Sequence, residues 1–386
     1  MRLKSICYAV GLVSCFAFTH AFAVPDVTGK PIIVQHLGKI DWPQEDPVTT
    51  PYLTQLSAND INDLHGDVSC DLIISTPGNY HMALRDAMKG RADLELTGLQ
   101  EQIKSLHDVS VCWSTSPPVS PQQIQAENLQ FKNISLTGRP ALAMGPGGVM
   151  NNLVANGLVD ATTRQPFLRN KGNVILARAD KVKKIQNVCD LGGKTRVATP
   201  NPTLEPGSFG NFSGTIFSVA EQNAFGCDST ELFNGIFSQN IAEFNISAFD
   251  NPYNIDAVLS VFGKGTQARG NSPKWIASSR IMHRDIPYAL CHDEADAGVI
   301  FYHLAIYLKR ELALTGCELQ IIPMGGTVDN PQPLPGNRVG TLHIAKVEGD
   351  YPPNVLAARD LIYDFLTASP IWTQIMADHG MDDPTP

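Results

Sequence analysis

The sequence predicts an α/β fold with a mostly parallel central sheet, and three observations lead to this prediction. A short apolar run, a polar or glycine-rich turn and a segment with helical spacing follow one another three times between residues 70 and 154. Further apolar runs alternate with helical segments up to the end of the chain. Hydrophobic residues make up 43% of the 386 residues, which is enough for one large core or two smaller ones. Alternation of this kind is typical of parallel α/β sheets, and the length favours two domains.

Each of the three repeats ends its strand in a turn. The strands are expected at Cys70–Ile74, Val109–Trp113 and Ala141–Met144, and the turns at Ser75–Asn79, Ser114–Pro118 and Gly145–Gly148. In open α/β sheets, ligands bind outside the carboxyl ends of the strands. The three turns are therefore expected to face one crevice.

The turn Gly145-Pro146-Gly147-Gly148 leads directly into a helical segment that starts near Val149. Such a turn leaves backbone N–H groups unpaired at the positive end of a helix, and glycine has no Cβ to keep a ligand away. It is therefore a seat for an anion or a polar head group. An ordinary structural turn is the alternative interpretation.

The second half of the chain repeats the alternation. Strands are expected at Gly172–Ala177, Arg196–Ala198, Asp296–Phe301, Leu319–Ile322 and Arg338–Ile344, and helices at Asn254–Phe262, Arg284–Leu290, His303–Leu312, Val355–Leu366 and Ile371–Met376. A proline-rich loop ends at Glu205-Pro206-Gly207-Ser208 and opens a further helix, whose first amides would point outward unless it is only an ordinary capped helix. Asp190–Thr195 is not a phosphate-binding loop, because Val188 stands where that loop requires its first glycine.

The first 23 residues predict a secretory signal peptide. A positive start precedes an apolar core and the small residues of Ala21-Phe22-Ala23, so cleavage is expected after Ala23. Leu12-Val13-Ser14-Cys15 also fits a lipoprotein cleavage box, which would leave a lipid anchor at Cys15. Residues 24–69 contain five prolines and are expected to form an extension packed over the body of the protein.

Charge and hydropathy limit the possible partners. Loss of Arg2 and Lys4 with the signal peptide leaves 27 basic and 38 acidic residues, a net charge of −11 with histidine neutral. Without a basic run the mature chain is not expected to bind nucleic acid. No later stretch reaches 18 uninterrupted apolar residues, so no membrane span is expected.

Six cysteines remain after the predicted cleavage, and an even number in an exported chain favours three disulfides. Nearness in sequence favours the pairs Cys70–Cys112, Cys189–Cys227 and Cys291–Cys317, with buried free thiols as the alternative. The spacings contain no CxxC or Cys/His pairing, so no metal site is expected.

Four segments resemble a known family. Glu294–Tyr302, which reads EADAGVIFY, is similar to the EADAGIVY strand of the type II periplasmic solute-binding proteins of ABC importers, especially the molybdate-binding branch. Tyr363–Pro370, followed by Ile375 and His379-Gly380-Met381, resembles the closing helices of that family. Asn173–Ala177 matches its first inter-domain strand, and Val197–Ser208 matches a loop that opens a helix in the second domain. The resemblance covers about Cys70–Met381.

The resemblance implies two α/β lobes joined by two crossing strands, with the solute in the cleft between them. The first lobe would comprise residues 70–173 and 321–386 and the second lobe residues 174–320, with hinge strands near Val174 and Ile321. The turns after the first two strands differ from those of the molybdate branch. The identity of the solute is therefore left open.

The expected ligand site consists of neutral donors, because dehydrated oxyanions are commonly held by helix N-terminal amides and hydroxyl groups. The residues expected to bind are Ser75, Thr76, Gly78, Asn79, Thr115, Ser116, Gly145, Gly147, Gly148, Glu205, Gly207 and Ser208, together with Tyr302, which the resemblance implies. Arg139 and Arg164 could supply charge for a carboxylate ligand. His81 and His303 are either ligands or satisfied structural groups.

Three functions are compatible with these features. The first is a monomeric periplasmic protein, without cofactor or metal, that captures a small anionic solute such as molybdate and delivers it to the permease of an ABC importer. The second is a receptor or interaction module that keeps the same fold. The third is an exported hydrolytic enzyme, but no GxSxG, HExxH or Walker motif is present and no catalytic residue is assigned. The acidic cluster Asp293, Glu294 and Asp296 is typical of a solvated strand entry.

Overall fold

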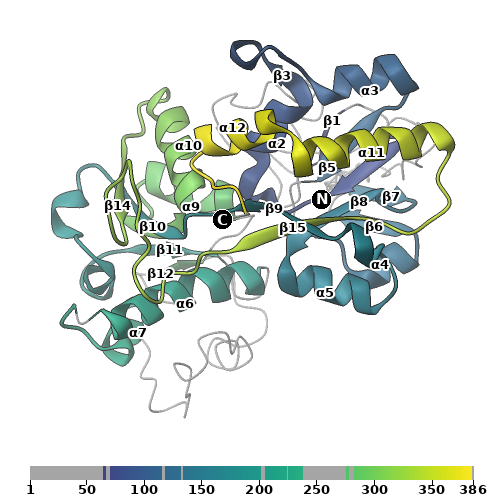
Figure 1. Cartoon of the computed structure of the whole chain (residues 1–386). Coiled ribbons are helices and arrows are strands. Elements are labelled where there is room, and N and C mark those ends of the chain that lie inside the picture. Colours follow the sequence, from purple (N-terminus) through teal and green to yellow (C-terminus); the bar gives the residue numbers. More distant parts are fainter. Residues whose placement is uncertain are drawn as a thin grey trace, which may run out of the picture.

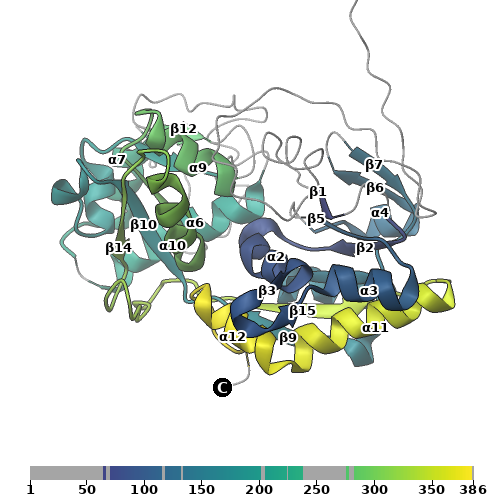
Figure 2. The same cartoon turned by 90° about the horizontal axis from the view of Figure 1, so that it is seen from above.

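Apart from two short hairpins, the described strands form two separate sheets, and each of these is the centre of an α/β lobe (Figures 1 and 2). The computed structural model describes residues 64–66, 70–114, 118–131, 134–200, 205–223, 225–237, 275–277 and 282–384. The predicted signal peptide, the alternative anchor Cys15, most of the extension and the helix expected at Asn254–Phe262 lie outside these residues.

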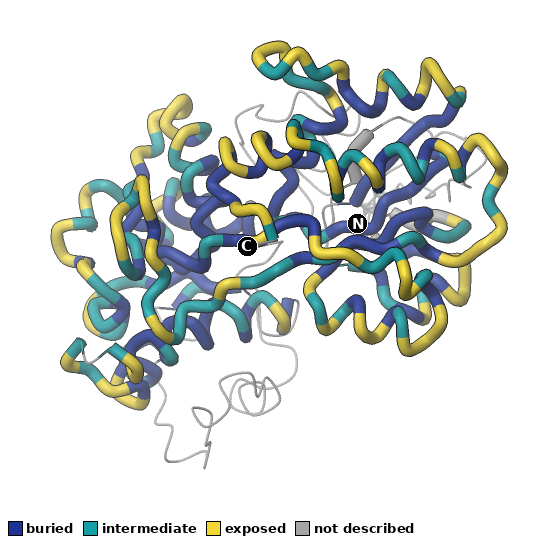
Figure 3. The backbone as a smooth tube through the Cα atoms, in the orientation of Figure 1, coloured by how far each residue is buried: buried dark blue, intermediate teal, exposed yellow. Residues whose placement is uncertain are grey.

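The first sheet has the strand order β1-β5-β2-β8-β15-β9. The bounds are β1 Leu64–Gly66, β2 Leu72–Ser75, β5 Val111–Ser114, β8 Leu142–Pro146, β9 Gln165–Arg169 and β15 Thr341–Lys346. β2 pairs in parallel with β5 and β8, whereas β1 and β15 run antiparallel to their neighbours, so four of the six strands point the same way. Every residue of β2 and β5 is buried, as expected for strands covered on both faces (Figure 3).

Helices cover both faces of the first sheet. One face carries α2 His81–Lys89, α3 Leu99–His107, α11 Pro353–Ala368 and α12 Pro370–Asp378, and the other carries α4 Pro121–Gln125 and α5 Gly147–Ala155 (Figure 1). The apolar faces of these helices complete two cores, one on each side of the sheet.

The second sheet has the strand order β12-β11-β13-β10-β14. The bounds are β10 Asn173–Arg178, β11 Val197–Thr199, β12 Trp275–Ala277, β13 Ala297–Phe301 and β14 Leu319–Pro323. β11 is parallel to β12 and β13, and β10 is antiparallel to β13 and β14. The helices α9 Met282–Cys291 and α10 Tyr302–Ala313 lie above this sheet in Figure 1, and α6 Pro206–Gln222 and α7 Ser229–Phe237 lie below it.

Short elements connect these larger ones. They are the hairpin strands β3 Gly90–Arg91, β4 Leu96–Thr97, β6 Asn128–Phe131 and β7 Ile134–Thr137, and the 3-10 helices η1 Gly78–Tyr80, η2 Ala92–Leu94, η3 Ala161–Thr163, η4 Val182–Lys184 and η5 Val188–Gly192. No helix among the described residues is long and apolar enough to cross a membrane.

The predicted α/β fold with two lobes and two chain crossings is confirmed. The three strands expected between residues 70 and 144 are β2, β5 and β8, which pair in parallel as neighbours. The structure corrects the extension in one respect, because Leu64–Gly66 pairs with β5 as the edge strand β1. This short stretch shows no strand pattern of its own, and its pairing depends on the edge that β5 offers.

The chain crosses between the lobes twice, and side-chain amides hold the two crossings together. The first crossing comprises residues 170–172 and the second residues 324–340. The Asn170 side-chain oxygen accepts hydrogen bonds from the N–H groups of Gly172 (2.9 Å) and Gly340 (3.1 Å). The Asn337 side chain accepts from the N–H of Asn173 and donates to the C=O of Asn173, both at 2.8 Å. Asn337 therefore pairs with the first residue of β10 as a residue of a neighbouring strand would.

The first crossing also depends on a glycine. Gly172 has φ +79°, and a Cβ at this position would lie 2.9 Å from Oδ1 of Asn337. From the other side, the Asn173 side chain donates to Asn211 (3.0 Å) and Thr215 (2.8 Å) of α6. The crossing is thus fixed to the second lobe by both backbone and side chain.

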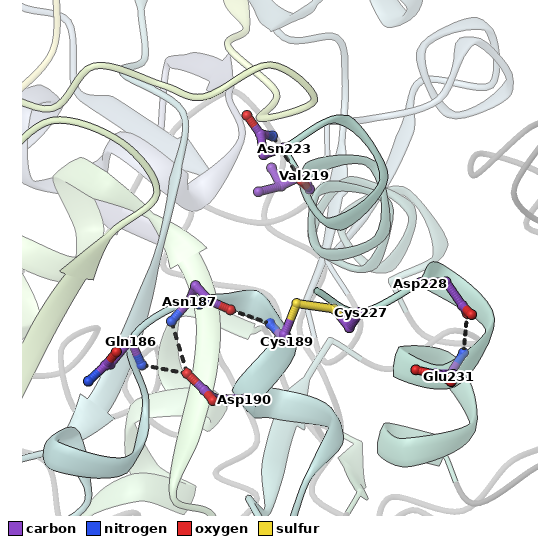
Figure 4. Close-up of a disulfide and its surroundings, with 9 residues drawn as sticks. All are labelled: Gln186, Asn187, Cys189, Asp190, Val219, Asn223, Cys227, Asp228 and Glu231. Carbon is purple, nitrogen blue, oxygen red and sulfur yellow. Dashed lines mark hydrogen bonds between the residues drawn. A yellow bond between two sulfur atoms is a disulfide. The ribbon is translucent and has the colours of Figure 1, made fainter. Parts of the chain in front are cut away.

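The three disulfides predicted from nearness in sequence are confirmed. Cys70–Cys112, Cys189–Cys227 and Cys291–Cys317 have Cα–Cα distances of 5.5, 5.8 and 5.4 Å. Figure 4 shows Cys189–Cys227, which ties η5 to the loop before α7. The Asp190 carboxylate accepts from the backbone N–H groups of Gln186 and Asn187 beside it, so the turn around this disulfide is also held by hydrogen bonds.

Replacing Asn337 by alanine tests the pairing of the two crossings. The variant leaves the N–H and C=O of Asn173 without their partner, so we expect the free energy of unfolding to fall by about 2–3 kcal/mol. Denaturant unfolding measures the loss. The matched control Asn152→Ala removes an exposed asparagine of α5 and should cost less than about 0.5 kcal/mol. Equal losses in the two variants would contradict a special role for Asn337.

Candidate functional site

The carboxyl ends of β2, β5 and β8 lie on one edge of the first sheet, because these strands are parallel neighbours. The turns that follow them are therefore brought together as expected. Of the predicted binding residues, Thr115 and Ser116 lie outside the described residues. The others can be placed individually.

The polar groups of Ser75 and Thr76 form hydrogen bonds within the first lobe. The Ser75 hydroxyl accepts from the N–H of Val119 (3.1 Å), and the N–H of Thr76 donates to the hydroxyl of Ser114 (3.1 Å). The hydroxyl of Thr76 shares a hydrogen bond with that of Tyr80. Both predicted residues are at most 1% exposed. The N–H of Thr76 thus ties the end of β2 to the end of β5, and the two predicted hydroxyl groups bond the loop before α4 and Tyr80. This is the role that a structural turn requires.

Burial affects the tyrosine of this network most strongly. Tyr80 is fully buried and donates to Sδ of Met144 (3.3 Å), so the network also reaches β8. Burial raises the pKa of Tyr80 well above its usual range, although the hydrogen bond with Thr76 opposes this shift. The phenol therefore remains a neutral group that joins the turn after β2 to β8.

Gly78 and Asn79 lie where the first lobe meets the second. Gly78 begins η1, and its C=O accepts from Nδ1 of His81 (3.1 Å). The C=O of Asn79 accepts from Nε2 of His303, the second residue of α10 in the other lobe. Oδ1 of Asn79 is buried and has no partner among the described residues. Asn79 is therefore a predicted residue that the structure places at the interface between the lobes.

The rest of this interface is formed by α2 against α9 and α10 (Figure 2). The ring of His81 stacks on His283 with centroids 5.5 Å apart and meets the ring of Tyr307 edge-on at 5.3 Å. Arg85 lies 3.5 Å from the Tyr307 hydroxyl, and Met82 is fully buried in the core of the second lobe. His81 and His303 are thus contacts between the lobes. His283, Tyr307 and Arg85 belong to the same interface but have no motif that marks them in the sequence.

The glycine turn after β8 divides into two parts. Gly145 belongs to β8, is buried, and pairs with His343 of β15. Gly147 and Gly148 begin α5, whose N-cap residue makes no side-chain cap. A Cβ at Gly147 would lie 3.7 Å from Nη2 of Arg164, and a Cβ at Gly148 would meet no atom within 4 Å. The start of α5 therefore combines uncapped amides with a nearby guanidinium, an arrangement that suits an anion.

Of the two arginines predicted to supply charge to a ligand, Arg164 lies near the glycine turn and Arg139 does not. Arg164 lies beside Gly147, where it also adds to the effect of burial in lowering the pKa of His343. Arg139 lies far from that turn and pairs with Glu127 (2.9 Å) at the amino ends of the strands. There it lines a cavity of about 780 Å³ together with Asp71, Asp108, Glu127, Glu348 and Asp350. Arg139 is therefore not brought together with the other predicted residues.

In the second lobe, Glu205 joins the starts of two helices. It precedes α6, and its carboxyl group accepts from the N–H of Met282, the first residue of α9, at 2.8 Å. Burial, with the nearby Asp285, raises the pKa of Glu205 to about 8. Its side chain is therefore protonated at neutral pH. Gly207 is exposed with open space around it, and Ser208 is partly exposed.

Tyr302 is engaged by the second crossing. Its hydroxyl donates to the C=O of Val328 at 2.6 Å, and its ring lies against Gly380, where an added Cβ would be 2.9 Å from Cε1. Burial raises the pKa of Tyr302, and Asp329 adds to this effect. In the structure this hydroxyl therefore stabilises the crossing, and it does not meet the other predicted donors.

The acidic cluster at the entry to β13 is neutralised by arginines. Arg196 pairs with Asp296 (2.8 Å) and with Asp293 (2.6 Å), and Arg178 also pairs with Asp293. The cluster thus forms an ion-pair network at a strand entry. Within the described ranges, no group of three or more His, Cys, Asp or Glu residues is arranged to hold a metal ion.

Comparison with known proteins finds solved structures of similar fold. No protein-family model matches the chain, and no curated protein matches it. The solved structure of Peb3 from Campylobacter jejuni is similar, with 12% identity, a TM-score of 0.45 and coverage of 81% of this chain and 100% of that one. AgtB from A. tumefaciens R10 in complex with agropinic acid has 12% identity and a TM-score of 0.46 over 81% of this chain and 82% of its own.

A third similar structure is a substrate-binding domain named for a molybdenum ABC transporter from Clostridium difficile. It has 14% identity and a TM-score of 0.41, and the match covers 81% of this chain and 98% of that one. At this level the likenesses concern the fold alone. The topology itself, with two sheets and two crossings, confirms the fold that the motifs implied.

Replacing Glu205 by glutamine tests its protonation. Because the pKa is raised from 4.5 to about 8 in the folded state, the folded protein binds more protons than the unfolded chain within this window. Wild-type stability should therefore fall as pH rises from 5 to 8, by up to about 1 kcal/mol per pH unit. Glu205→Gln should lack this component in denaturant unfolding at each pH. The control Glu101→Gln, at an exposed position, should keep it, and parallel pH profiles for wild type and Glu205→Gln would contradict the assignment.

Proposed function

We propose that this chain is a periplasmic solute-binding protein that captures a small anion between its lobes and delivers it to the permease of an ABC importer. The observation that carries the proposal is the pair of adjacent crossings, held by Asn170 and Asn337, as the connection between two α/β lobes. Two lobes joined in this way can close on a ligand by a hinge motion. The proposed lobes follow the predicted ranges, 70–173 with 321–386 and 174–320, except at their joins. Asn173 and all of β14, up to Pro323, belong to the second sheet, so the crossings at 170–172 and 324–340 divide the lobes.

The chemistry of the solute is inferred from the start of α5. Its first amides are uncapped, Gly147 and Gly148 allow close approach, and the Arg164 guanidinium is adjacent. The macrodipole and the cation both favour a negative ligand. The net negative charge of the chain does not oppose this inference, because aligned amides act locally whereas distant surface charges are screened. An oxyanion such as molybdate, or a small carboxylate, fits these donors.

The three disulfides and the predicted signal peptide support an extracytoplasmic location. The proposed partners are the solute and the importer permease, and the proposed working form is a monomer without cofactor. Of the predicted residues, we propose Asn79, Gly147, Gly148 and Gly207 for binding. Ser208 is a weaker candidate, because its side chain is hydrogen-bonded to Glu205.

A ligand panel tests the proposed function. The mature protein should show a higher melting temperature with at least one of molybdate, tungstate, sulfate, phosphate and small carboxylates, because a ligand that binds only the folded state stabilises it. Thermal unfolding with and without each anion measures the shift. A flat response across these anions, and across panels of amino acids and sugars, would overturn the transport proposal.

Gly147→Val tests where the anion binds. An added Cβ would lie at ordinary contact distances from Arg164 and His343, so the variant should fold with a melting temperature close to wild type in the absence of anion. A branched side chain should block approach to the amides and weaken binding at least about tenfold in titration calorimetry. Ala155→Val adds branched carbon at an exposed position at the other end of α5, so it is the matched control and should bind normally. Unchanged affinity in Gly147→Val would remove α5 from the site.

A further inference from the structure

One hydrogen bond between the lobes involves a group that titrates. His303 belongs to α10 in the second lobe and is 1% exposed, and its Nε2 donates to the C=O of Asn79 in η1 of the first lobe. The His303 ring stacks on Phe301, with centroids 5.4 Å apart and planes 15° apart. The ring is therefore fixed in position at the interface by both lobes.

The partner of His303 determines which nitrogen carries the proton. A carbonyl oxygen can only accept, so the proton of the neutral ring lies on Nε2 and Nδ1 carries the lone pair. Nδ1 is buried and has no hydrogen-bond partner among the described residues. A second proton would have to bind to Nδ1, where it would create a buried donor without an acceptor next to a new positive charge.

The charged groups around His303 offer no compensation. His379, from the end of the first lobe, faces it and would repel a charged ring. The carboxylate near this point, Asp86 of α2, is already bonded to His379 (2.9 Å) and also pairs with Arg85 and Arg91. Other titratable groups of the described interface are Tyr302 and Tyr307 of α10, His81 of α2 and His283 of α9. Asp329 of the second crossing acts on Tyr302.

The balance of these effects is a lowered pKa. Burial lowers the pKa of His303 to about 4, with the hydrogen bond to Asn79 opposing the shift and His379 adding to it. A ring released into solvent would titrate near its ordinary value of 6.5. The separated state therefore binds more protons than the closed state between these two values.

We propose that the hydrogen bond between His303 and Asn79 is a pH-sensitive latch that holds the lobes together at neutral pH and releases them on acidification. The inference deepens the proposed function and rests on it, because a solute enclosed by the lobes would be released when they separate. Closure is unaffected above about pH 6.5 and weakens by up to about tenfold per pH unit below it, until about pH 4. The capture of solute is thereby coupled to the acidity of the surrounding fluid.

The latch can be tested on the mature protein without any solute. Small-angle X-ray scattering from pH 8 to pH 4.5 should show a rise in the radius of gyration for the wild type, while far-ultraviolet circular dichroism shows that the lobes remain folded. His303→Gln keeps an amide N–H that can reach the C=O of Asn79 but does not titrate, so its radius should stay constant. His292→Gln, at an exposed histidine of the second lobe, is the matched control and should open like the wild type.

A second measurement follows the His303 ring directly. Its nuclear magnetic resonance signal, assigned as the histidine signal that His303→Gln lacks, should titrate well below 6.5 in the closed wild type. The assignment separates it from His343, whose pKa is also lowered. A constant radius in the wild type, a wild-type transition in His303→Gln, or titration of the His303 ring near 6.5 would each overturn the latch. None of these readouts uses a ligand, so failure of the anion panel and failure of the latch are separate results.

Discussion

The arrangement of this molecule depends on two side-chain amides at the places where the chain crosses between its sheets. A primary amide offers one donor face and one acceptor face at the spacing of a peptide group, so Asn337 can stand beside Asn173 as a strand residue would. Aspartate lacks the donor, and leucine lacks both functions. Asn170 connects to Gly340 differently: its side-chain oxygen accepts from the Gly340 N–H, and its backbone N–H donates to the Gly340 C=O. The two crossings are therefore neighbours through specific hydrogen bonds, and the relation between the two sheets follows from them.

The sequence predicts the parts of the fold whose physical signal is local. Strands β2, β5 and β8 are buried on both faces and therefore appear as continuous apolar runs. Disulfides between cysteines in adjacent elements are visible as nearness in sequence. By contrast, Leu64–Gly66 is a strand only because β5 offers it an edge, and Asn170 and Asn337 lie in connections without any periodicity. Such features depend on partners that are distant along the chain.

The ligand donors of the candidate site are also difficult to predict from the sequence, because their availability depends on partners distant along the chain. Residue type indicates which groups can donate a hydrogen bond, but not which groups are already satisfied. Ser75 and Thr76 are of the residue types that bind anions, yet their hydroxyl groups are already bonded to the N–H of Val119 and to the hydroxyl of Tyr80. The hydroxyl of Tyr302 is bound to a carbonyl 26 residues away. Gly147 and Gly148, the first residues of α5, are easier to interpret, because they have no side chain that could cap their own amides.

The three disulfides have a consequence for how the molecule responds to redox conditions. Cys70–Cys112 lies within the first lobe, and Cys189–Cys227 and Cys291–Cys317 lie within the second. Every cysteine of the described chain is therefore used to brace one lobe internally, and the crossings rely on hydrogen bonds, from the asparagine amides and from the Tyr302 hydroxyl. Oxidation strengthens each half as a separate unit and places no covalent tether on their relative motion. The disulfides thus stiffen each lobe, whereas the hydrogen bonds at the crossings leave the two lobes free to move relative to each other.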